Sequence, residues 1–344
     1  MRYGFVFLLV LCSTAITLHA QDSIRFERFK NNPIITADLL PGSDGEDING
    51  PSLIKVPDWI PNKLGKYYLY FAHHKGKYIS LAYADNLKGP WRIYKPGTLQ
   101  ISDCKTCENG LQNSGNSVKH EGAESSEDEV THMASPDVLI DRADQQLVLY
   151  FHCPIEDGKK YKGQYSLRAT STDGIHFRAD SIVLGYSYFR VFKWKGYYYS
   201  ISRAGLLARS VDGIQTFEQG PNPFSKIQNK SDYLRHAAVK LSGDTLFVFY
   251  SRVGDAPERI VLSKIILNDD WNTWSASQPI DVAAPSEKYE GGDLPVSPSV
   301  AGLFYGKVRQ LRDPYVYEEN GRWYLLYSAA GENSIVIGEL HFNQ

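Results

Sequence analysis

The stretch QLRDPYVYEENGRWYLLYSAAGE, residues 310–332, carries the pattern that repeats along the chain. Arg-Asp-Pro opens it and an aromatic strand follows. A turn at Glu319-Asn320-Gly321 then leads into a second strand rich in Tyr and Leu. Two such runs around a short polar turn predict a β-hairpin. Taken alone, the stretch leaves two roles open for Asp313, a turn residue or a carboxylate at the entrance of a site.

The same pattern of a short apolar strand, a turn and a strongly aromatic strand recurs along the chain. Its five copies span residues 48–91, 133–177, 188–217, 235–267 and 310–342. Units of roughly 40 residues that each form a small antiparallel sheet are typical of a β-propeller. A β-sandwich does not predict five similar units, so we expect an all-β, single-domain, five-bladed β-propeller over residues 21–344.

The first twenty residues, MRYGFVFLLVLCSTAITLHA, have a basic start, an apolar run and a small residue before Gln21. They predict a secretory signal peptide cleaved near Ala20, and therefore a periplasmic or secreted protein. Cys12 would suit a lipoprotein, but Leu11 precedes it where a small residue is needed. No other stretch is apolar enough to span a membrane. A net charge of −2 argues against a nucleic-acid partner.

Three cysteines, Cys104, Cys107 and Cys153, follow the signal peptide. So few cysteines predict a domain stabilised by its core and not by disulfides. The C-x-x-C motif fits a local disulfide, half of a metal site or two free thiols. Zinc needs about four ligands, so we expect no metal and a disulfide between two of the three.

Two long connections interrupt the repeats. Residues 104–130 are polar and acidic and predict a long loop, and residues 271–310 are dense in Gly and Pro towards their end. The acidic run 124–129 lacks the spacing of an EF-hand, so a calcium ion, although compatible with a propeller channel, is not predicted. We expect no cofactor.

The inner strand of each propeller blade lines the central channel, so corresponding positions of the repeats converge in space. At the entry to these strands stand Asp47, Asn49, His132, Asp137, Arg190, Arg235, His236, Arg312 and Asp313. Just past the second strands stand His73, His74, His152, Arg203, Arg252 and Glu332. Some of them can be turn caps or plain ion pairs. A ring of buried charge is costly, however, and therefore predicts a polar substrate pocket.

Several short motifs give the repeats a family likeness. SPDVLI (135–140) and RDPYVY (312–317) open repeats, and AYADNLKGPWRIY (82–94), STDGIHF (171–177) and SVDGIQTF (210–217) end them. Over residues 32–342 they resemble the five-bladed glycoside hydrolases of the arabinanase/β-xylosidase type (family 43) and the α-neoagarobiose hydrolase type. The resemblance implies cleavage of glycosidic bonds in plant or algal oligosaccharides by carboxylates in a central pocket.

The resemblance also implies a base from the first blade, an Asp that tunes its pKa, and a general acid, usually Glu. Asp137, directly after Pro136, matches the tuning residue. The first blade has Gly50 where the family has an Asp before Pro-Ser, so Asp47 is the candidate base. Glu290, followed by two glycines, is the candidate acid. Its rivals are Glu287, Asp293, His73, His74 and His236.

The remaining candidates would bind substrate: His73, His74, His132, His152, Arg203, His236, Arg252, Arg312 and Asp313. Arg203 and Arg312 suit a substrate carboxylate or sulfate, or they hold the catalytic carboxylates in place. Two other functions stay open. A glycoside phosphorylase of the same fold would need basic residues near the base to hold phosphate. A non-catalytic sugar-binding propeller would not bring acid and base together. The sugar, the linkage and the oligomeric state do not follow from the sequence.

Overall fold

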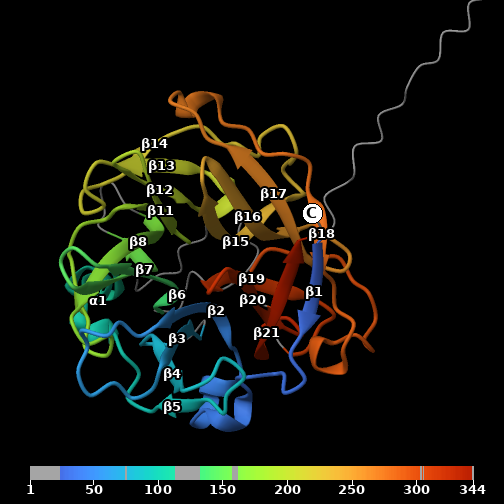
Figure 1. Ribbon diagram of the computed structural model, residues 1–344, viewed down its shortest axis with the longest axis horizontal. Coiled ribbons are helices and arrows are strands. Elements are labelled where there is room, and N and C mark those ends of the chain that lie inside the picture. The colour runs from blue at the N-terminus through green and yellow to red at the C-terminus, as the bar shows by residue number, and fades with distance from the viewer. Residues whose placement is uncertain are drawn as a thin grey trace, which may run out of the picture.

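The computed structural model describes residues 24–73, 76–112, 132–156, 162–302, 304 and 306–342. Their strands form five antiparallel sheets arranged as blades around a common centre (Figure 1). The predicted all-β, five-bladed propeller is confirmed. The predicted signal peptide, His74 and most of the predicted acidic loop lie outside the described residues. No helix in the described part is long and apolar enough to cross a membrane.

Each blade runs outward from an inner strand. Blade 1 consists of β2 (Asn49–Lys55), β3 (Tyr67–Ala72), β4 (Ser80–Ala84) and β5 (Arg92–Tyr94). Blade 2 consists of β6 (Ala134–Asp141), β7 (Gln146–Glu156) and β8 (Lys162–Ser171), with the short β9 (Arg178–Ala179) and β10 (Gly185–Tyr186) both paired to β8. Blade 3 consists of β11 (Arg190–Trp194), β12 (Tyr197–Ile201), β13 (Leu207–Ser210) and β14 (Glu218–Gln219).

Blade 4 consists of β15 (Tyr233–Ser242), β16 (Thr245–Val253), β17 (Ile260–Ile266) and β18 (Ile280–Ala283). Blade 5 consists of β19 (Leu311–Glu319), β20 (Arg322–Ala329), β21 (Ser334–Phe342) and β1 (Ile24–Arg28). Helical structure comprises α1 (Lys105–Gln112) and the 3-10 turns η1 (Ala37–Leu39), η2 (Gly42–Gly45), η3 (Ile101–Asp103), η5 (Arg203–Gly205), η6 (Trp271–Thr273) and η7 (Lys288–Glu290).

The ring is closed by the two ends of the described chain. The N-terminal strand β1 pairs antiparallel with β21, with Ile24 opposite Phe342 and Arg28 opposite Gly338. In Figure 1 the blue β1 accordingly lies beside the red β21 at the edge of the same blade. The N-terminal strand therefore completes the last blade.

The core lies between the blades. The middle strands are buried on both faces, which is why β3 (YYLYFA) reads as a continuous aromatic and apolar run. Neighbouring blades pack through such strands: Tyr70 of blade 1 makes an edge-to-face contact with Phe177 of blade 2 at 5.9 Å. Burial of these faces holds the inner strands in a fixed position around the channel.

Four inner strands begin with a β-bulge. The pairing register shifts between Asn49 and Ser52 in blade 1, and at the corresponding points of blades 2, 4 and 5. Gly50 and Asp313 occupy equivalent bulge positions with φ of +60° and +48°. A Cβ on Gly50 would lie 3.1 Å from the Cα of Ser135. Close approach of the backbones therefore favours glycine where the resembling family has its Asp.

Candidate active site

One residue from each inner strand occupies an equivalent position, directly after the bulge where the strand has one. This set, the floor ring, consists of Ser52, Asp137, Arg190, Ala237 and Tyr315. Hydrogen bonds join its members across blades: the Val138 amide donates to Ser52 Oγ at 2.9 Å, and Arg190 Nε donates to the Ala237 carbonyl at 2.8 Å. These bonds link blade 1 to blade 2 and blade 3 to blade 4.

Asp137, the candidate tuning residue, belongs to the floor ring and is buried. Its Oδ2 accepts a hydrogen bond from the Val191 amide at 2.9 Å, and the guanidinium of Arg190 lies nearby. Burial raises the pKa of Asp137, and Arg190 and the Val191 amide oppose that rise without cancelling it. A neighbouring carboxyl group whose own ionisation is disfavoured is suited to tuning the charge of the site above it.

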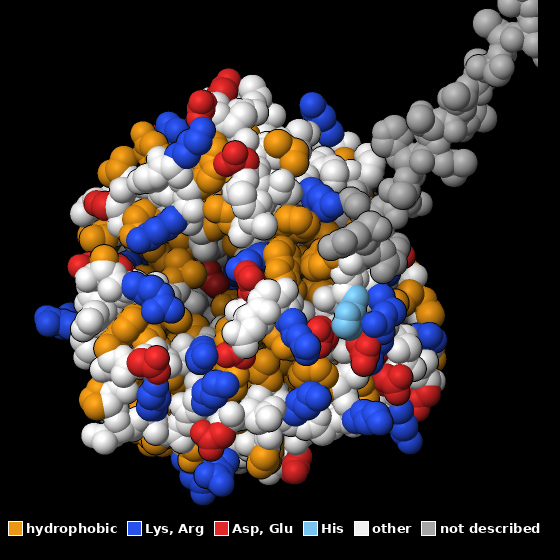
Figure 2. Space-filling view, in the orientation of Figure 1, with side chains coloured by type: hydrophobic (Ala, Val, Ile, Leu, Met, Phe, Trp, Pro, Cys, Tyr) orange, Lys and Arg blue, Asp and Glu red, His pale blue; other side chains and the backbone are white. Residues whose placement is uncertain are grey.

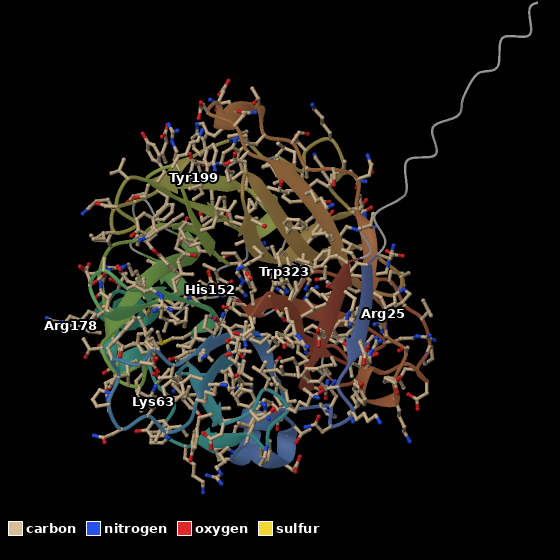
Figure 3. All side chains as sticks on the ribbon, in the orientation of Figure 1. Arg25, Lys63, His152, Arg178, Tyr199 and Trp323 are labelled. Carbon is tan, nitrogen blue, oxygen red and sulfur yellow. A yellow bond between two sulfur atoms is a disulfide. The ribbon has the colours of Figure 1, made fainter. Side chains whose placement is uncertain are left out.

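Above the floor, aromatic rings from three blades form a wall of the channel. The His132 and His152 rings are 5.8 Å apart, the His152 and Tyr188 rings 4.4 Å, and the Tyr188 and His236 rings 4.7 Å. Figure 3 places His152 near the centre of the ring of blades. The repeat pattern predicted that these histidines converge, and the structure brings them together around Tyr188.

His236 and Asp313 form the end of this wall. His236 Nδ1 lies 2.8 Å from Asp313 Oδ1, and both side chains are buried. The two groups form an ion pair when the imidazole is protonated. In the described part of the chain Nε2 of His236 has no hydrogen-bond partner, which leaves this nitrogen for a ligand. An imidazole is one of the side chains that can serve as a general acid.

Asp47, the candidate base, lies in a network of acidic and amide groups on the other side of blade 5. Asn49 Nδ2 donates to Asp47 Oδ1 at 2.6 Å and to Glu332 Oε2 at 3.4 Å. One side-chain amide therefore bridges two carboxylates from blades 1 and 5. Asp47, Asn49 and Glu332 are all buried.

Two arginines balance the charge of these carboxylates. Arg312 is fully buried, and Nη1 lies 3.0 Å from Glu332 Oε1 while Nε lies 3.2 Å from Glu258 Oε2. Its Nη2 donates to Gln310 Oε1 at 2.6 Å. Arg235 lies 3.8 Å from Glu258 and 3.9 Å from Glu332 and donates to the carbonyls of Val300 and Gly302. Of the two roles expected for Arg312, its contacts fit the holding of carboxylates and not substrate binding.

The surroundings of Glu290 contradict its assignment as the general acid. Glu290 has no exposed surface. Its carboxylate accepts hydrogen bonds from Arg28 Nε at 2.6 Å, from the Tyr327 hydroxyl at 2.5 Å and from the Ser286 amide at 2.8 Å. Arg28 is on the outermost strand of blade 5, so Glu290 fixes the ring closure and has no oxygen left for a substrate. Gly291, at φ +74°, ends the 3-10 turn η7 instead of admitting a ligand.

The other predicted binding residues are spread over the same end of the blades. His73 follows β3 and is buried. Arg252 is engaged by Asp255 at 2.6 Å and by Asp232 at 3.5 Å. The amide of Arg203 donates to the Ser187 carbonyl at 3.0 Å, which fixes the Arg203 loop beside Tyr188. Figure 2 shows this view of the molecule hollowed near its centre, with acidic and basic side chains beside the hollow.

Sequence reasoning left two residues out of the proposed site and gave a third no role. Glu332 was expected just past a second strand, beside the other candidates, but no function was assigned to it. Tyr188 has φ of +67°, matching the bulge positions Gly50 and Asp313, but no sequence motif marks it. Glu258 lies between β16 and β17 of blade 4, in the connection equivalent to the one that holds Glu332 in blade 5, but no motif in the sequence marks it.

The cysteines form a separate buried cluster. Cys107 on α1 and Cys153 on β7 form a disulfide, and Cys104 is a buried thiol whose Sγ lies 2.8 Å from Cys107 Sγ. All three sulfur atoms lie within 4.8 Å of one another. The disulfide attaches α1 to the strand that carries His152, and burial raises the pKa of Cys104 to about 11.

Comparison with known sequences gives one relative of similar length. No family model matches the chain. The uncharacterized protein R118 of Acanthamoeba polyphaga mimivirus is 36% identical over 333 residues, which cover 91% of this chain and 89% of R118.

Solved structures share the fold at low sequence identity. A GH43 β-xylosidase/α-arabinofuranosidase from a compost microbial metagenome, solved with xylotriose, superposes with a TM-score of 0.55 at 14% identity and covers 91% of this chain and 94% of that one. A structure from the GH130 family of mannoside phosphorylases and β-1,2-mannoside hydrolases gives 0.58 at 11%, covering 91% and 93%. A putative glycoside hydrolase from Parabacteroides distasonis gives 0.57 at 10%, covering 91% and 95%. The likeness extends over the whole propeller.

Proposed function

We propose that this chain, which belongs to one protein family with the mimivirus protein R118, is a glycoside hydrolase that cleaves oligosaccharides in its central channel. The observation that carries the proposal is the buried His236–Asp313 pair at 2.8 Å. It lies on blades 4 and 5, and blade 5 also provides Glu332, which shares Asn49 with Asp47. An imidazole and a carboxylate held on either side of one blade supply the acid and the base.

The proposed mechanism uses water as the nucleophile. Asp47 accepts a proton from the water as its oxygen bonds to the anomeric carbon. His236 Nε2–H donates a proton to the glycosidic oxygen as the bond from that oxygen to the anomeric carbon breaks. Asp313 orients the imidazole, and Asn49 orients the carboxylate of Asp47. Direct attack by water inverts the configuration at the anomeric carbon, so the first product formed has the opposite anomeric form to the substrate.

The arginine contacts favour hydrolysis over phosphorolysis. A phosphorylase needs cationic side chains that are free to hold phosphate. Arg235 and Arg312 are instead bonded to Glu258, Glu332 and neighbouring carbonyl groups. Their positive charge is already neutralised, and releasing it would leave two buried carboxylates without partners.

The substrate and the compartment belong to the same proposal. Solved propellers of this shape include enzymes named for xylosides, arabinofuranosides and mannosides. Together with the sequence motifs they support an oligosaccharide from plant or algal material as the substrate class. The predicted signal peptide supports a location outside the cytoplasm, in the periplasm or the medium.

A hydrolysis screen tests the proposal. The purified protein is incubated with xylo-, arabino-, manno- and neoagaro-oligosaccharides, with and without inorganic phosphate, and products are separated by chromatography. We expect phosphate-independent release of sugar, lost in Asp47→Asn, with the inverted anomer appearing first by proton NMR. Release of a sugar phosphate only when phosphate is present would favour the phosphorylase. Binding without turnover of any substrate would favour a sugar-binding propeller.

A further inference from the structure

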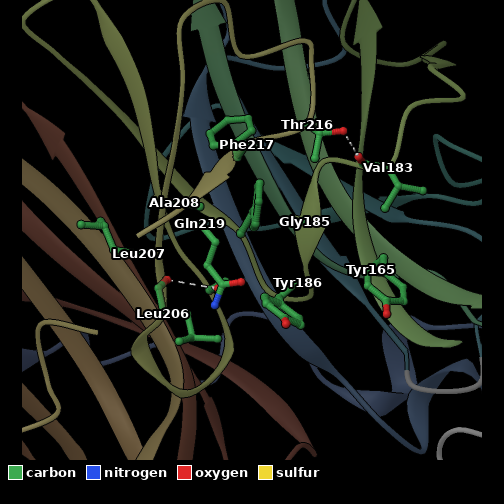
Figure 4. Close-up of a pocket in the computed structure, with 12 residues that line it drawn as sticks. Tyr165, Val183, Gly185, Tyr186, Leu206, Leu207, Ala208, Thr216, Phe217 and Gln219 are labelled. Carbon is green, nitrogen blue, oxygen red and sulfur yellow. Dashed lines mark hydrogen bonds between the residues drawn. The ribbon is translucent and has the colours of Figure 1, made fainter. Parts of the chain in front are cut away.

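A second pocket lies between blades 2 and 3, outside the channel. Its volume is about 250 Å³, and Figure 4 shows the residues around it. On one side they come from β8, from β10 and from the chain on either side of β10. On the other side they come from β13, β14 and residues 202–206. The lining residues used here are Tyr165, Tyr186, Phe189, Ser202, Thr216 and Gln219.

The pocket exists because the facing strands are short. β10 and β14 have two residues each, so the outer parts of blades 2 and 3 do not fill the space between them. Gly185 is required at the pocket wall, because a Cβ there would lie 2.8 Å from the ring of Phe189. The absence of a side chain at Gly185 therefore leaves room for the ring of Phe189 at the pocket wall.

Two tyrosines provide a flat apolar surface on one side. The Tyr165 and Tyr186 rings are 6.4 Å apart and nearly parallel, at an interplanar angle of 19°. Tyr186 is 46% exposed although it is a large aromatic residue. Its main-chain carbonyl accepts a hydrogen bond from Ser166 Oγ at 2.7 Å, so its backbone is held in place. An exposed, fixed tyrosine ring is the kind of surface on which the apolar face of a sugar stacks.

The polar groups of the pocket suit hydroxyl groups. Ser202 Oγ donates to the Leu206 carbonyl at 3.1 Å, and Thr216 Oγ1 donates to the Val183 carbonyl at 2.9 Å. Each hydroxyl oxygen keeps a lone pair that can accept a hydrogen bond from a ligand. Gln219 is exposed at the rim and offers both a donor and an acceptor. The described lining contains no charged side chain, so a neutral ligand fits it better than an ionic one.

The volume of the pocket suits a ligand with a single ring. A protein cavity of about 150 Å³ holds benzene, and drug-sized ligands need roughly 300–1,000 Å³. A pocket of about 250 Å³ lies between these limits. It therefore fits one six-membered ring that carries several hydroxyl groups.

One side of the pocket is close in sequence to the channel wall. Ser202 lines it, and the next residue, Arg203, donates its amide to Ser187, which directly precedes Tyr188 of the channel wall. This backbone contact links the pocket lining to the channel wall. We propose that the pocket binds one neutral sugar ring of an oligosaccharide whose other end occupies the channel. This inference rests on the proposed function for the identity of the ligand.

The test uses Tyr186→Ala, which removes an exposed ring and leaves the backbone bond to Ser166. Tyr197→Ala is the matched control, because Tyr197 is 37% exposed on β12 of blade 3 and does not line the pocket. The oligosaccharide series of the hydrolysis screen is used from disaccharide to hexasaccharide. KM is measured for active protein, and calorimetric binding is measured in an Asp47→Asn background.

We expect Tyr186→Ala to raise KM and the dissociation constant about five- to ten-fold for the longer oligosaccharides, as loss of one stacking contact predicts. The disaccharide values and all values of Tyr197→Ala should stay unchanged. An equal effect of Tyr186→Ala on short and long substrates, or none on either, would overturn the inference. So would failure of every oligosaccharide to bind.

The two proposals fail separately. If the protein hydrolyses oligosaccharides but Tyr186→Ala behaves like the control, the pocket assignment is wrong and the function stands. If no substrate is cleaved but Tyr186→Ala selectively weakens binding of long oligosaccharides, the pocket assignment stands and the hydrolase is wrong.

Discussion

The imidazole of His236 and the carboxylate of Asp313 meet at 2.8 Å across the boundary between blades 4 and 5. Neither side chain is more than 5% exposed, so water competes weakly for this contact. The contact places the Nδ1 side of the His236 ring against Asp313 and leaves Nε2 on the other side of the ring. A residue held in this way can act in catalysis only through Nε2, and the first prediction rests on that.

His236→Gln should slow cleavage in proportion to how much the leaving group needs a proton. Loss of a general acid lowers kcat by about 10²–10⁴-fold for a sugar leaving group. Nitrophenolate leaves without protonation, so nitrophenyl glycosides should be cleaved at nearly the normal rate. Rates on both substrate types measure the effect. Asp47→Asn is the control, because loss of the base should slow both. An equal fall in the cleavage rate of both substrate types in His236→Gln would show that His236 is not the general acid.

Asp137→Asn should abolish most activity and yet stabilise the protein at neutral pH. Burial raises the pKa of Asp137, so its ionised form is disfavoured in the folded state. The penalty is full when the pH is above the folded-state pKa. It disappears when the pH falls below the unfolded-state value, because Asp137 is then protonated in both states. The asparagine carbonyl can still accept from the Val191 amide.

The measurement is thermal unfolding of Asp137→Asn and wild type across a pH series. At pH 7 we expect the variant to melt about 2–4 °C higher, which corresponds to roughly 1 kcal/mol. The difference should shrink as the pH is lowered. A variant that melts lower at pH 7 would show that Arg190 gains more from the carboxylate than burial costs.

Arg312→Met should strongly destabilise the protein. Glu258 and Glu332 would lose a buried partner at 3.2 and 3.0 Å, and breaking a buried ion pair from one side costs about 3–5 kcal/mol. Urea unfolding gives the free energy of unfolding. Adding Glu332→Gln to Arg312→Met should recover part of the loss, because one uncompensated charge is removed. Simple additivity of the two substitutions would show that the two side chains are not coupled.

Glu290→Gln should leave catalysis intact and weaken the fold. Its carboxylate pairs with Arg28 and Tyr327 at the ring closure and not with the channel residues. Loss of charge-assisted hydrogen bonds costs roughly 1.5–3 kcal/mol. We expect normal kcat/KM for folded protein together with a lower midpoint of urea unfolding. A large fall in kcat at unchanged stability would restore Glu290 as the acid.

Cys104 should resist alkylation in the native state. Burial raises the pKa of its thiol to about 11, so little thiolate forms below that pH, and the thiolate is the reactive species. Iodoacetamide at pH 8 followed by mass spectrometry should leave Cys104 unmodified until denaturant is added. Digestion without reductant should yield one peptide pair linked through Cys107 and Cys153. A link through Cys104 would contradict the observed pairing.

The fold was predictable because the five repeats share turns and aromatic strands, and repeated patterns reinforce one another. The same argument found His236, Asp313 and the histidine wall, because propeller symmetry brings equivalent residues to one channel. It failed for Glu290, which lies in the connection between blades 4 and 5, where no repeat register applies. The two glycines after Glu290 suggested that a ligand could approach the backbone there. In the structure Gly291 instead ends the 3-10 turn η7.

The sequence predicted which residues lie in the site better than it predicted the contacts between them. Asn49 and Arg312 were both expected near the channel, but nothing in the sequence shows that one amide bridges Asp47 and Glu332. Which carboxylate an arginine engages depends on the loop of Glu258, whose position is set by tertiary packing. The periodicity of a strand predicts on which face of its sheet a side chain lies. It does not predict which side chains pair across neighbouring blades, and only the structure shows those pairs.

The pairing of β1 with β21 has a consequence for assembly. Blades 1 to 4 are each built from consecutive segments, whereas blade 5 takes its outermost strand from the opposite end of the chain. Without β1, strand β21 would present unpaired amide and carbonyl groups along an open edge. The β1 strand of another copy carries the same hydrogen-bonding pattern and can occupy that edge, which is domain swapping. The Arg28–Glu290 contact holds β1 on its own blade and therefore disfavours this exchange of strands.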